Sequence, residues 1–390
     1  MKRFYKLNNL TGILIVTAFL TVFSCKQKPT TNTNTEKTGF IPSIDKFHDG
    51  IHHWRLFHEG GHYNRYVPSD YTAIANNFIA YQNSDGGWPK NIDWLGAVNA
   101  DSLLNTLPEQ HRRSTLDNDN CYSQIEYLSQ VYYLTRDDKY KQSAIKGINY
   151  ILNSQNASGG WRGWDVDAIT FNDQVMSGVM NLFLDILEGN KYYSWINDSL
   201  KSKIKTAYDR ALSVTLKCQI VVNGEKTAWC QQHNHKTLKP IKARSFELPA
   251  ITANESSDVL KFLMRIKNPN DSVKNAIISG VKWLKKSALH GIRLERVKID
   301  TSKIIYKEYP YDLIVVHDSS ASPIWARYYD IKTNTPFMCN RDGHIVYKLS
   351  DVALERRTGY GWYGYWPAEV VYKLYPQWLE ENNIKSTDDK

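Results

Sequence analysis

The chain of 390 residues carries 49 Lys and Arg against 40 Asp and Glu, a formal net charge of +9, and 42% of its residues are hydrophobic. A basic balance of this kind suits anionic polymers or anionic membranes as partners, although solubility alone would also account for it. The chain has no basic run, no zinc-ligand spacing and no RNA-binding aromatic motif, which disfavours nucleic acid as a partner.

Residues 1–24 have the pattern of a bacterial export signal. Basic residues precede an apolar run over 13–23 that is short for a membrane span. The run ends before Cys25 in a pattern similar to the lipobox of bacterial lipoproteins, in which this cysteine carries lipid. Phe23 is bulkier than that pattern prefers, so simple secretory cleavage and an uncleaved anchor stay open. We expect an exported protein, lipid-anchored at the cell envelope in the periplasm or on the outer-membrane surface.

Residues 25–39 are predicted to form a flexible tether, because their polar composition cannot bury enough surface to offset chain entropy. Residues 40–390 then form one domain, long but within the range of single toroids and barrels. The remaining cysteines are Cys121, Cys218, Cys230 and Cys339. Four cysteines in an oxidising compartment allow three disulfide pairings, and the spacing selects none of them.

Helical periodicity dominates this domain. Along the stretch "NDQVMSGVMNLFLDILEGN" the apolar residues recur at helical spacing, at Val175, Val179, Leu182, Phe183, Ile186 and Leu187. A second helix is predicted after Asp271 and Ser272, either of which could cap its start. The segment 293–309 alternates instead and predicts a short β-hairpin. The pattern therefore favours an all-α dominated fold with short irregular β segments.

A weak internal repeat adds to the helical pattern. The stretch "NSDGGWPKN" at 83–91 resembles "NASGGWRGW" at 156–164, and "TAWCQQHN" at 227–234 is interpreted as a third, decayed copy. Their tryptophans, at positions 88, 161 and 229, are 73 and 68 residues apart. A repeat of that length fits two helices with loops, so we predict an incomplete α/α toroid whose loops gather at one face.

Clustered acidic residues lie just before two predicted helices. Asp117, Asn118 and Asp119 stand in the stretch "STLDNDNCYSQIEYL", and Asp173 begins the helix described above. Capping of the helix N-terminus explains one such residue at each place. Three consecutive oxygen donors exceed that need and suit Ca²⁺, although the loop is not an EF-hand and the spacing alone is a weak signal.

Further along the chain come cations and aromatic residues. Arg244 and Glu247 lie three residues apart in "KARSFELP", and Arg327 and Arg341 flank a turn. Arginine matches carboxylates bidentately, yet scattered arginines also occur on solvated surfaces. The stretch "ERRTGYGWYGYWP" gathers five aromatic residues within 360–366, which could stack on sugars or fill a core corner.

Together these motifs resemble one family. The segments "GGWPKN", "TLDN", "FNDQVM", "ARSFELPAI", "WARYYDI", "RDG" and "ERRTGYGWYG" occur in the order seen in pectate lyases of polysaccharide lyase family 10. The resemblance covers about residues 75–378. It implies an α/α-toroid enzyme over residues 40–390 that cleaves polygalacturonate, the pectin backbone, by Ca²⁺-assisted β-elimination. We expect the protein to be a monomer.

The resemblance also assigns roles to residues. It implies that Arg244 is the base that removes the C5 proton, with Asp173 a second active-site carboxylate. It implies that Asp117 and Asp173 bind calcium. The residues implied or predicted to bind substrate are Lys90, Asn118, Arg327, Arg341, Trp362 and Tyr363. After Asn118 the sequence departs from the common pattern at Asp119-Asn120-Cys121, which could alter the metal site or a subsite.

The implied chemistry is physically consistent. Removal of the C5 proton builds negative charge beside a carboxylate, which calcium and arginines would neutralise. Guanidinium has a pKa above about 12, so an arginine base predicts alkaline activity. We expect a nearby cation to lower that pKa.

Three alternatives remain at this stage. A glycoside hydrolase could use Asp167 and Asp173 as acid and base without calcium. A surface glycan-binding lipoprotein would use the 360–366 aromatic residues as a platform. A lyase acting on another uronate polymer, such as alginate, would keep the chemistry and change the substrate.

Overall fold

The computed structural model describes residues 39–58, 62–100, 104–300 and 310–385. The predicted signal peptide, Cys25 and nearly all of the tether lie outside these residues. Within the described ranges, no helix combines the length and apolar character that crossing a membrane requires. The description below concerns the unit Ile41–Lys390.

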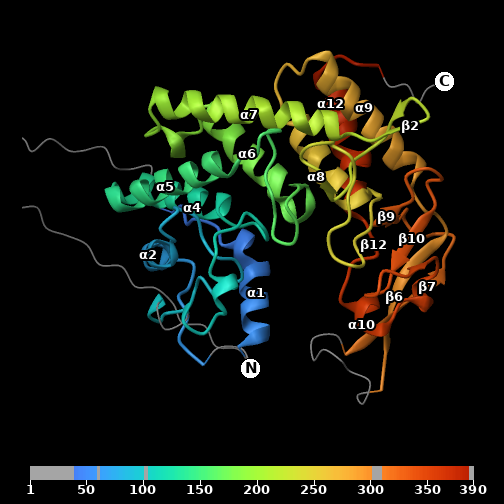
Figure 1. Cartoon of the computed structure of the whole chain (residues 1–390), viewed down its shortest axis with the longest axis horizontal. Helices are drawn as coiled ribbons and strands as arrows, with labels where there is room; N and C mark the ends of the chain where they lie inside the picture. The colour runs from blue at the N-terminus through green and yellow to red at the C-terminus, as the bar shows by residue number, and fades with distance from the viewer. Residues whose placement is uncertain (1–38, 59–61, 101–103, 301–309, 386–390) are drawn as a thin grey trace, which may run out of the picture. The chain divides into compact units, whose positions relative to one another are not determined.

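Successive helices of the chain alternate between an outer row and an inner row (Figure 1). The outer row consists of α2 (Tyr71–Tyr81), α5 (Asp138–Ser154), α7 (Asp198–Cys218) and α9 (Asp271–Lys286). The inner row consists of α4 (Tyr122–Thr135), α6 (Val175–Leu187) and α8 (Ala253–Met264). Each inner helix packs on the outer helix that follows it, and neighbours within a row also touch. This alternation confirms the predicted α/α toroid.

Short elements complete the helical part. The helix α1 (His48–Phe57) follows a 3₁₀ turn, and the C-terminal segment contains α10 (Leu354–Thr358), α11 (Trp366–Glu369), a π-helical turn (Val370–Leu374) and α12 (Tyr375–Glu381). The 3₁₀ turns among the described residues are Asp45–Phe47, which precedes α1, and Glu109–His111, Asn172–Gln174, Lys191–Tyr193 and Leu349–Asp351. The π-helical turn packs against α8 and α9, so the C-terminal segment borders the last repeat.

Outer and inner helices differ in burial as their sequences predict. Ten residues of α6 are buried, among them Val175, Val179 and Phe183, because the helix has neighbours on several sides. The outer helices bury one face and begin with good caps, since Asn197 and Asn270 accept backbone N–H bonds from the first turns of α7 and α9. The expected cap of α9 by Asp271 or Ser272 is therefore wrong by one position.

The predicted repeat is present in three dimensions. The indole N–H groups of Trp88, Trp161 and Trp229 each donate to a carbonyl of the preceding outer helix, at 2.7, 2.8 and 2.8 Å. A glutamine at each outer-helix end then bonds both its own loop and the next outer helix. These are Gln82, Gln155 and Gln219. The decayed third copy thus keeps both the tryptophan hydrogen bond and the glutamine hydrogen bonds.

Glycine is required in the first two loops. Gly86 and Gly159 have φ of +92° and +103°, and a Cβ at either position would come within 2.4 to 2.7 Å of a carbonyl oxygen of the next outer helix. The loops therefore press against the neighbouring helix, which fixes the backbone leading to the inner helices.

The strands are short. A four-stranded sheet has the order β11-β10-β9-β5, and β12 pairs with β8, β4 with β1 and β3 with β2, all antiparallel. Their bounds are β1 (Ile169–Thr170), β2 (Val221–Val222), β3 (Glu225–Lys226), β4 (Gln232–His233), β5 (Ile251–Thr252), β8 (Trp325–Ala326), β9 (Tyr328–Tyr329), β10 (Pro336–Cys339), β11 (Ile345–Val346) and β12 (Tyr363–Gly364). These pairs hold the loops that carry Arg244, Arg327 and Arg341.

The predicted hairpin exists but is longer than the sequence indicated. Strand β6 (Ile292–Lys298) pairs antiparallel with β7 (Tyr311–His317), with Ile292 opposite His317. The second strand lies beyond 293–309, and residues 301–309 lie outside the described part. All four cysteines of the domain, Cys121, Cys218, Cys230 and Cys339, are buried and free of disulfide bonds.

Candidate functional site

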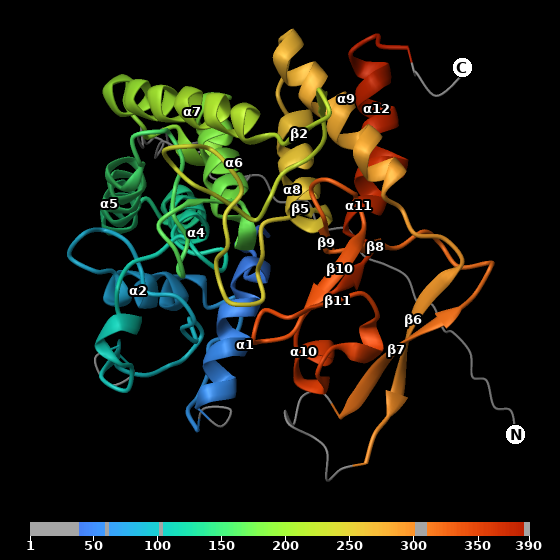
Figure 2. The same cartoon turned by 45° about the vertical axis from the view of Figure 1, so that its right-hand side comes forward.

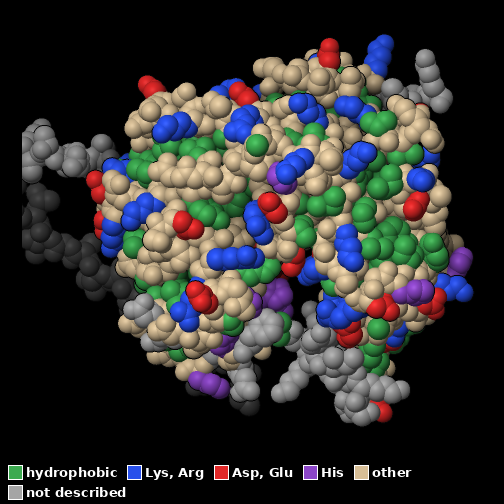
Figure 3. Space-filling view, viewed as in Figure 1, with side chains coloured by type: hydrophobic (Ala, Val, Ile, Leu, Met, Phe, Trp, Pro, Cys, Tyr) green, Lys and Arg blue, Asp and Glu red, His purple; other side chains and the backbone are tan. Residues whose placement is uncertain are grey.

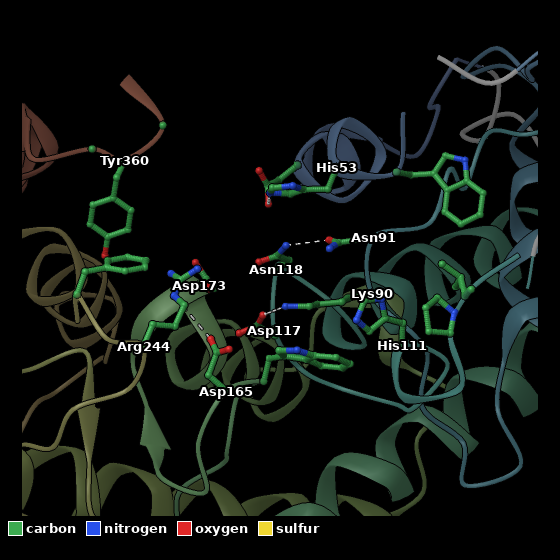
Figure 4. A pocket seen from close by; sticks show the side chains of 18 of the residues that line it. His53, Lys90, Asn91, His111, Asp117, Asn118, Asp165, Asp173, Arg244 and Tyr360 are labelled. Carbon is green, nitrogen blue, oxygen red and sulfur yellow. Dashed lines mark hydrogen bonds and ion pairs between the residues drawn. The ribbon is translucent and has the colours of Figure 1, made fainter. Parts of the chain in front are cut away.

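A cleft of about 910 Å³ opens beside the N-terminal ends of the inner helices (Figure 4). Seven of the nine predicted site residues line it: Lys90, Asp117, Asn118, Asp173, Arg244, Arg327 and Arg341. They come from the loops before α4, α6 and α8 and from turns beside β8 to β11. The fold therefore joins motifs that are far apart in the sequence.

The two carboxylates predicted to bind metal are not helix caps. The residue preceding α4 is Cys121 and that preceding α6 is Gln174, and neither helix start receives a side-chain cap. Asp117 forms an ion pair with Lys90, and Asp173 accepts a bond from the Asn172 amide at 2.7 Å. The capping interpretation is wrong here, and both carboxylates face the cleft instead.

Asp117 and Asp173 act on each other electrostatically. The Asp173 residue is exposed and lines the cleft. Desolvation is nevertheless the largest cause that raises the pKa of its carboxyl well above the usual range. The charge of Asp117 is the second cause, and Arg327 opposes both. The charge of Asp117 thus disfavours ionisation of Asp173, and two carboxylates close enough to interact in this way are suited to share a cation.

The backbone around these carboxylates is unusual. Asn118, Asp119 and Asp173 have φ of 57°, 55° and 48°, in the left-handed region that few non-glycine residues adopt. At Cys121 φ is 67° and ψ is −58°, and the Tyr122 N–H donates across this tight turn to the Asn120 carbonyl at 2.9 Å. Such conformations persist where surrounding contacts over-determine them, and they cluster at functional sites.

Tertiary contacts hold the strained loop in place. The Asn120 amide donates to the carbonyls of Trp88 and Thr115 at 2.7 and 2.8 Å, and Asp119 accepts from the Tyr122 hydroxyl at 2.8 Å. The departure from the family pattern at Asp119-Asn120-Cys121 therefore supports the loop rather than lining the cleft. Asn118 itself donates to Asn91 at 2.9 Å.

Arg244 is held as a cation by two further carboxylates. Its guanidinium contacts Glu247 at 2.5 Å and Asp165 at 3.8 Å, and its backbone N–H donates to Glu247 at 3.2 Å. Glu247 is buried, and through its two contacts it pairs with the Arg244 cation and orders the local backbone.

The protein's own groups raise the pKa of Arg244. Burial, the largest cause, favours the neutral guanidine, but the hydrogen bond and charge of Glu247 outweigh it and raise the pKa of Arg244. The same pairing keeps the pKa of Glu247 below its usual range although burial opposes this. The protein's own groups therefore do not lower the pKa of Arg244.

The other two predicted arginines differ in freedom. Arg327 contacts Glu255 at 2.6 Å and Asn172 at 3.0 Å and is largely buried. Burial favours its neutral form, but Glu255 and neighbouring tyrosines raise its pKa well above the usual value. Arg341 is bidentate on Glu355 at 2.9 and 3.1 Å, with 55% of its side chain exposed. Both guanidinium groups remain charged at the cleft.

The predicted aromatic platform is not where the sequence suggested. Trp362 is only 2% exposed, packs in a second core with Tyr328 and Phe246, and donates its indole N–H to the Arg356 carbonyl at 2.9 Å. Tyr363 belongs to β12 and does not line the cleft. Both predicted substrate contacts are corrected: the aromatic side chains at this end of the cleft are Phe246 and Tyr360.

Sequence reasoning missed several cleft residues. Arg356, from the same motif as Tyr360, lines the cleft over the Phe246 ring, with its guanidinium 4.9 Å from the ring centroid. Asp165 also lines the cleft. The α1 residues that line the cleft carry no motif. Asp167 does not line it and pairs with His235 at 3.6 Å, which disfavours the hydrolase alternative.

Three comparisons with known proteins bear on this site. A family model described as pectic acid lyase matches residues 82–371. Among curated proteins, no sequence matches the chain. Among the solved structures similar to this chain are two of a family 10 polysaccharide lyase from Cellvibrio cellulosa.

The first of these structures is an aspartate-to-alanine mutant in complex with trigalacturonic acid. It is 27% identical, with a TM-score of 0.64, and the match covers 79% of this chain and 92% of that one. The second is 26% identical, with a TM-score of 0.65, and the match covers 88% and 99% respectively.

Proposed function

This chain belongs to the pectic acid lyase family and is a polysaccharide lyase, and from that premise we propose that its substrate is polygalacturonate. The observation that carries the proposal is the pairing, across one cleft, of Asp117 and Asp173 with a set of arginines. A polymer of acidic sugars needs cations to bind its carboxylates, and arginine provides them in a bidentate geometry. The complex of the Cellvibrio enzyme with trigalacturonic acid supports the same substrate class.

The proposed reaction is β-elimination. Arg244, in its neutral form, takes the proton from C5 of a galacturonate unit. The electrons of that C–H bond form the C4–C5 double bond as the bond from C4 to the glycosidic oxygen breaks. The departing oxygen takes a proton from solvent water and becomes a new chain end, the hydroxide left behind is neutralised by the proton that Arg244 later releases, and the other product carries the 4,5-unsaturated sugar.

Glu247 and Asp165 determine where Arg244 points and when it can accept a proton. Because Glu247 raises the pKa of Arg244, the neutral guanidine is populated only at strongly alkaline pH. The same contact fixes the guanidinium in the cleft, which orients the base before substrate binds. Alkaline activity therefore follows from this arrangement.

Asp117 and Asp173 fit a calcium ion by the chemistry of their donors. Within the described part of the chain, no group of three or more His, Cys, Asp or Glu side chains is placed to hold a metal ion. Calcium also takes amide and backbone oxygens, water and substrate carboxylates, which would have to complete its shell. Bound there, Ca²⁺ would offset the negative charge that develops beside the substrate carboxylate.

Lys90, Asn118, Arg327 and Arg341 are proposed to position the polymer. Arg341 is exposed and able to rotate toward a galacturonate carboxylate, whereas Arg327 is fixed by Glu255. Lys90 forms an ion pair with Asp117, so it holds that carboxylate in place until metal or substrate binds.

The test is absorbance of the unsaturated product from polygalacturonate at alkaline pH, with calcium and then with chelator. We expect calcium-dependent absorbance, lowered by about 10² to 10⁴-fold in Arg244→Ala because the base is lost. Lys242→Ala, a nearby exposed cation outside the cleft lining, is the matched control. Reducing ends without absorbance would indicate a hydrolase, and neither signal would favour a binding protein.

We also propose export and lipid attachment at Cys25. The support is sequence alone: the signal pattern of residues 1–24 and the polar stretch that follows. Mass spectrometry of the protein from a bacterial membrane fraction tests this, because a lipidated N-terminus is absent from Cys25→Ala.

A further inference from the structure

Half of the residues that build one wall of the cleft precede the family-matched region. The family model starts at residue 82, whereas α1 at 48–57 and the residue after it contribute to the cleft lining. We call this surface the histidine wall; it consists of Asp49, His53, His58, Leu107, Pro108 and His111. In Figure 2, α1 faces the C-terminal segment that carries α10.

The histidine wall and the facing wall differ in charge. Arg244, Arg327, Arg341 and Arg356 line the far side of the cleft. In Figure 4, His53 and His111 lie on one side and Arg244 and Tyr360 on the other, with Asp117 and Asn118 between them. Figure 3 shows histidines along one edge of the hollow and Lys or Arg side chains along the facing edge.

Among the described residues, the cations that line the cleft are Lys90 and the four arginines of the far side, so none belongs to the histidine wall. Lys90, which also lines the cleft, is already bound to Asp117. Asp49 instead presents a carboxylate with 55% of its side chain exposed, 3.7 Å from His53. Histidine is in general uncharged at alkaline pH, so this wall offers no fixed positive charge to a galacturonate carboxylate.

The wall is nevertheless a built surface. The His58 ring stacks on Trp54 with centroids 3.7 Å apart and planes 6° apart. One of its ring nitrogens is 2.9 Å from the Trp54 carbonyl, and the other is 3.3 Å from the Thr106 hydroxyl. These contacts fasten the loop that carries Leu107 and Pro108 to α1, so polar and apolar groups meet at a fixed place.

We propose that the histidine wall is a subsite for a methyl-esterified galacturonate unit. An ester removes the charge that Asp49 would repel and that no cation here would bind. Leu107 and Pro108 supply apolar contact for the methyl group, while His53 and Asp49 are available to sugar hydroxyls. The inference rests on the proposed function and adds to it that the polymer lies with acidic units at the arginines and an esterified unit at α1.

The test compares purified wild-type protein on unesterified and on partly methyl-esterified oligogalacturonates, with product sequencing by mass spectrometry. We expect methyl esters to accumulate at one fixed distance from the cleavage point. His53→Arg places a cation on the wall and should abolish that accumulation. It should also raise kcat/KM on unesterified oligomers by about threefold, as for a partly exposed ion pair.

His52→Arg is the matched control, because it adds the same charge to the same helix at a position outside the cleft lining. It should leave both the ester pattern and the substrate preference unchanged. Esters excluded from every product position next to the cut, or equal effects of the two variants, would overturn the subsite alone. A wild-type protein that yields no unsaturated product even from unesterified polymer would contradict the proposed lyase reaction, and the subsite with it.

Discussion

His233 makes folding stability depend on pH in a way that can be worked out from its contacts. Its side chain is fully buried, one ring nitrogen lies 2.8 Å from the Leu238 carbonyl, and the other accepts the Cys230 N–H at 3.1 Å. The first nitrogen must therefore carry the hydrogen, and the ring is neutral. Burial is the largest cause that lowers the pKa of His233, to about 4, and the Leu238 carbonyl opposes it.

The sign follows from proton uptake. In the unfolded chain an imidazole binds a proton near pH 6.5, whereas the folded protein resists it until about pH 4. The unfolded state thus gains protons first as the pH falls, and stability is lost through this window. The slope in mid-window is about 1.4 kcal/mol per pH unit, and the total contribution is about 3 kcal/mol.

Urea unfolding followed by tryptophan fluorescence at several pH values between 7.5 and 4 measures this slope. His233→Gln removes the titrating group, so its free energy of unfolding should fall less steeply than that of the wild type. His344→Gln, at an exposed position, should keep the wild-type slope. Equal slopes in wild type and His233→Gln would refute the reasoning.

Two further predictions concern the metal site and the packing behind it. Asp117→Asn should weaken calcium binding at least about tenfold, measured by calorimetry and by the calcium dependence of product absorbance; unchanged binding would remove Asp117 from the ligand set. Gly178→Ala should destabilise the fold by about 1–3 kcal/mol in urea unfolding, because a Cβ at this position would lie 2.2 Å from the Tyr122 ring. An unchanged midpoint would show that the α4–α6 contact can yield.

The repeat could be predicted because the residues that form its loops recur in the sequence. Glycine pairs and tryptophan recur at nearly constant steps, and each tryptophan does fasten a loop to its outer helix. The third copy has Thr-Ala-Trp in place of Gly-Gly-Trp and is predicted from its tryptophan alone. The glutamines at 82, 155 and 219 escaped notice, because a single polar residue at a helix end has many structural uses.

The site was predictable where several motifs agreed, and less so where a side chain had two plausible environments. Trp362 illustrates the second case: glycine-flanked aromatic residues fit a sugar platform and a core corner equally, and only tertiary packing distinguishes them. Asp173 illustrates the reverse. A carboxylate before a helix suggests a cap, but positive φ at Asp173 and Gln174 turns it away from the helix start. The histidine wall has no sequence motif, so only the fold reveals it.

The loops of the three repeat copies divide the cleft's charges between them. Each copy runs from an outer helix through its tryptophan loop to an inner helix, and each contributes cleft residues at that same point. The first two contribute Asp117 and Asp173, whereas the third, the copy least like the others, contributes Arg244. The loops before the inner helices thus carry charges of opposite sign in different copies, so the cleft has an electrical polarity. An acidic polymer has one favoured side on which to lie there, before any single contact selects its register.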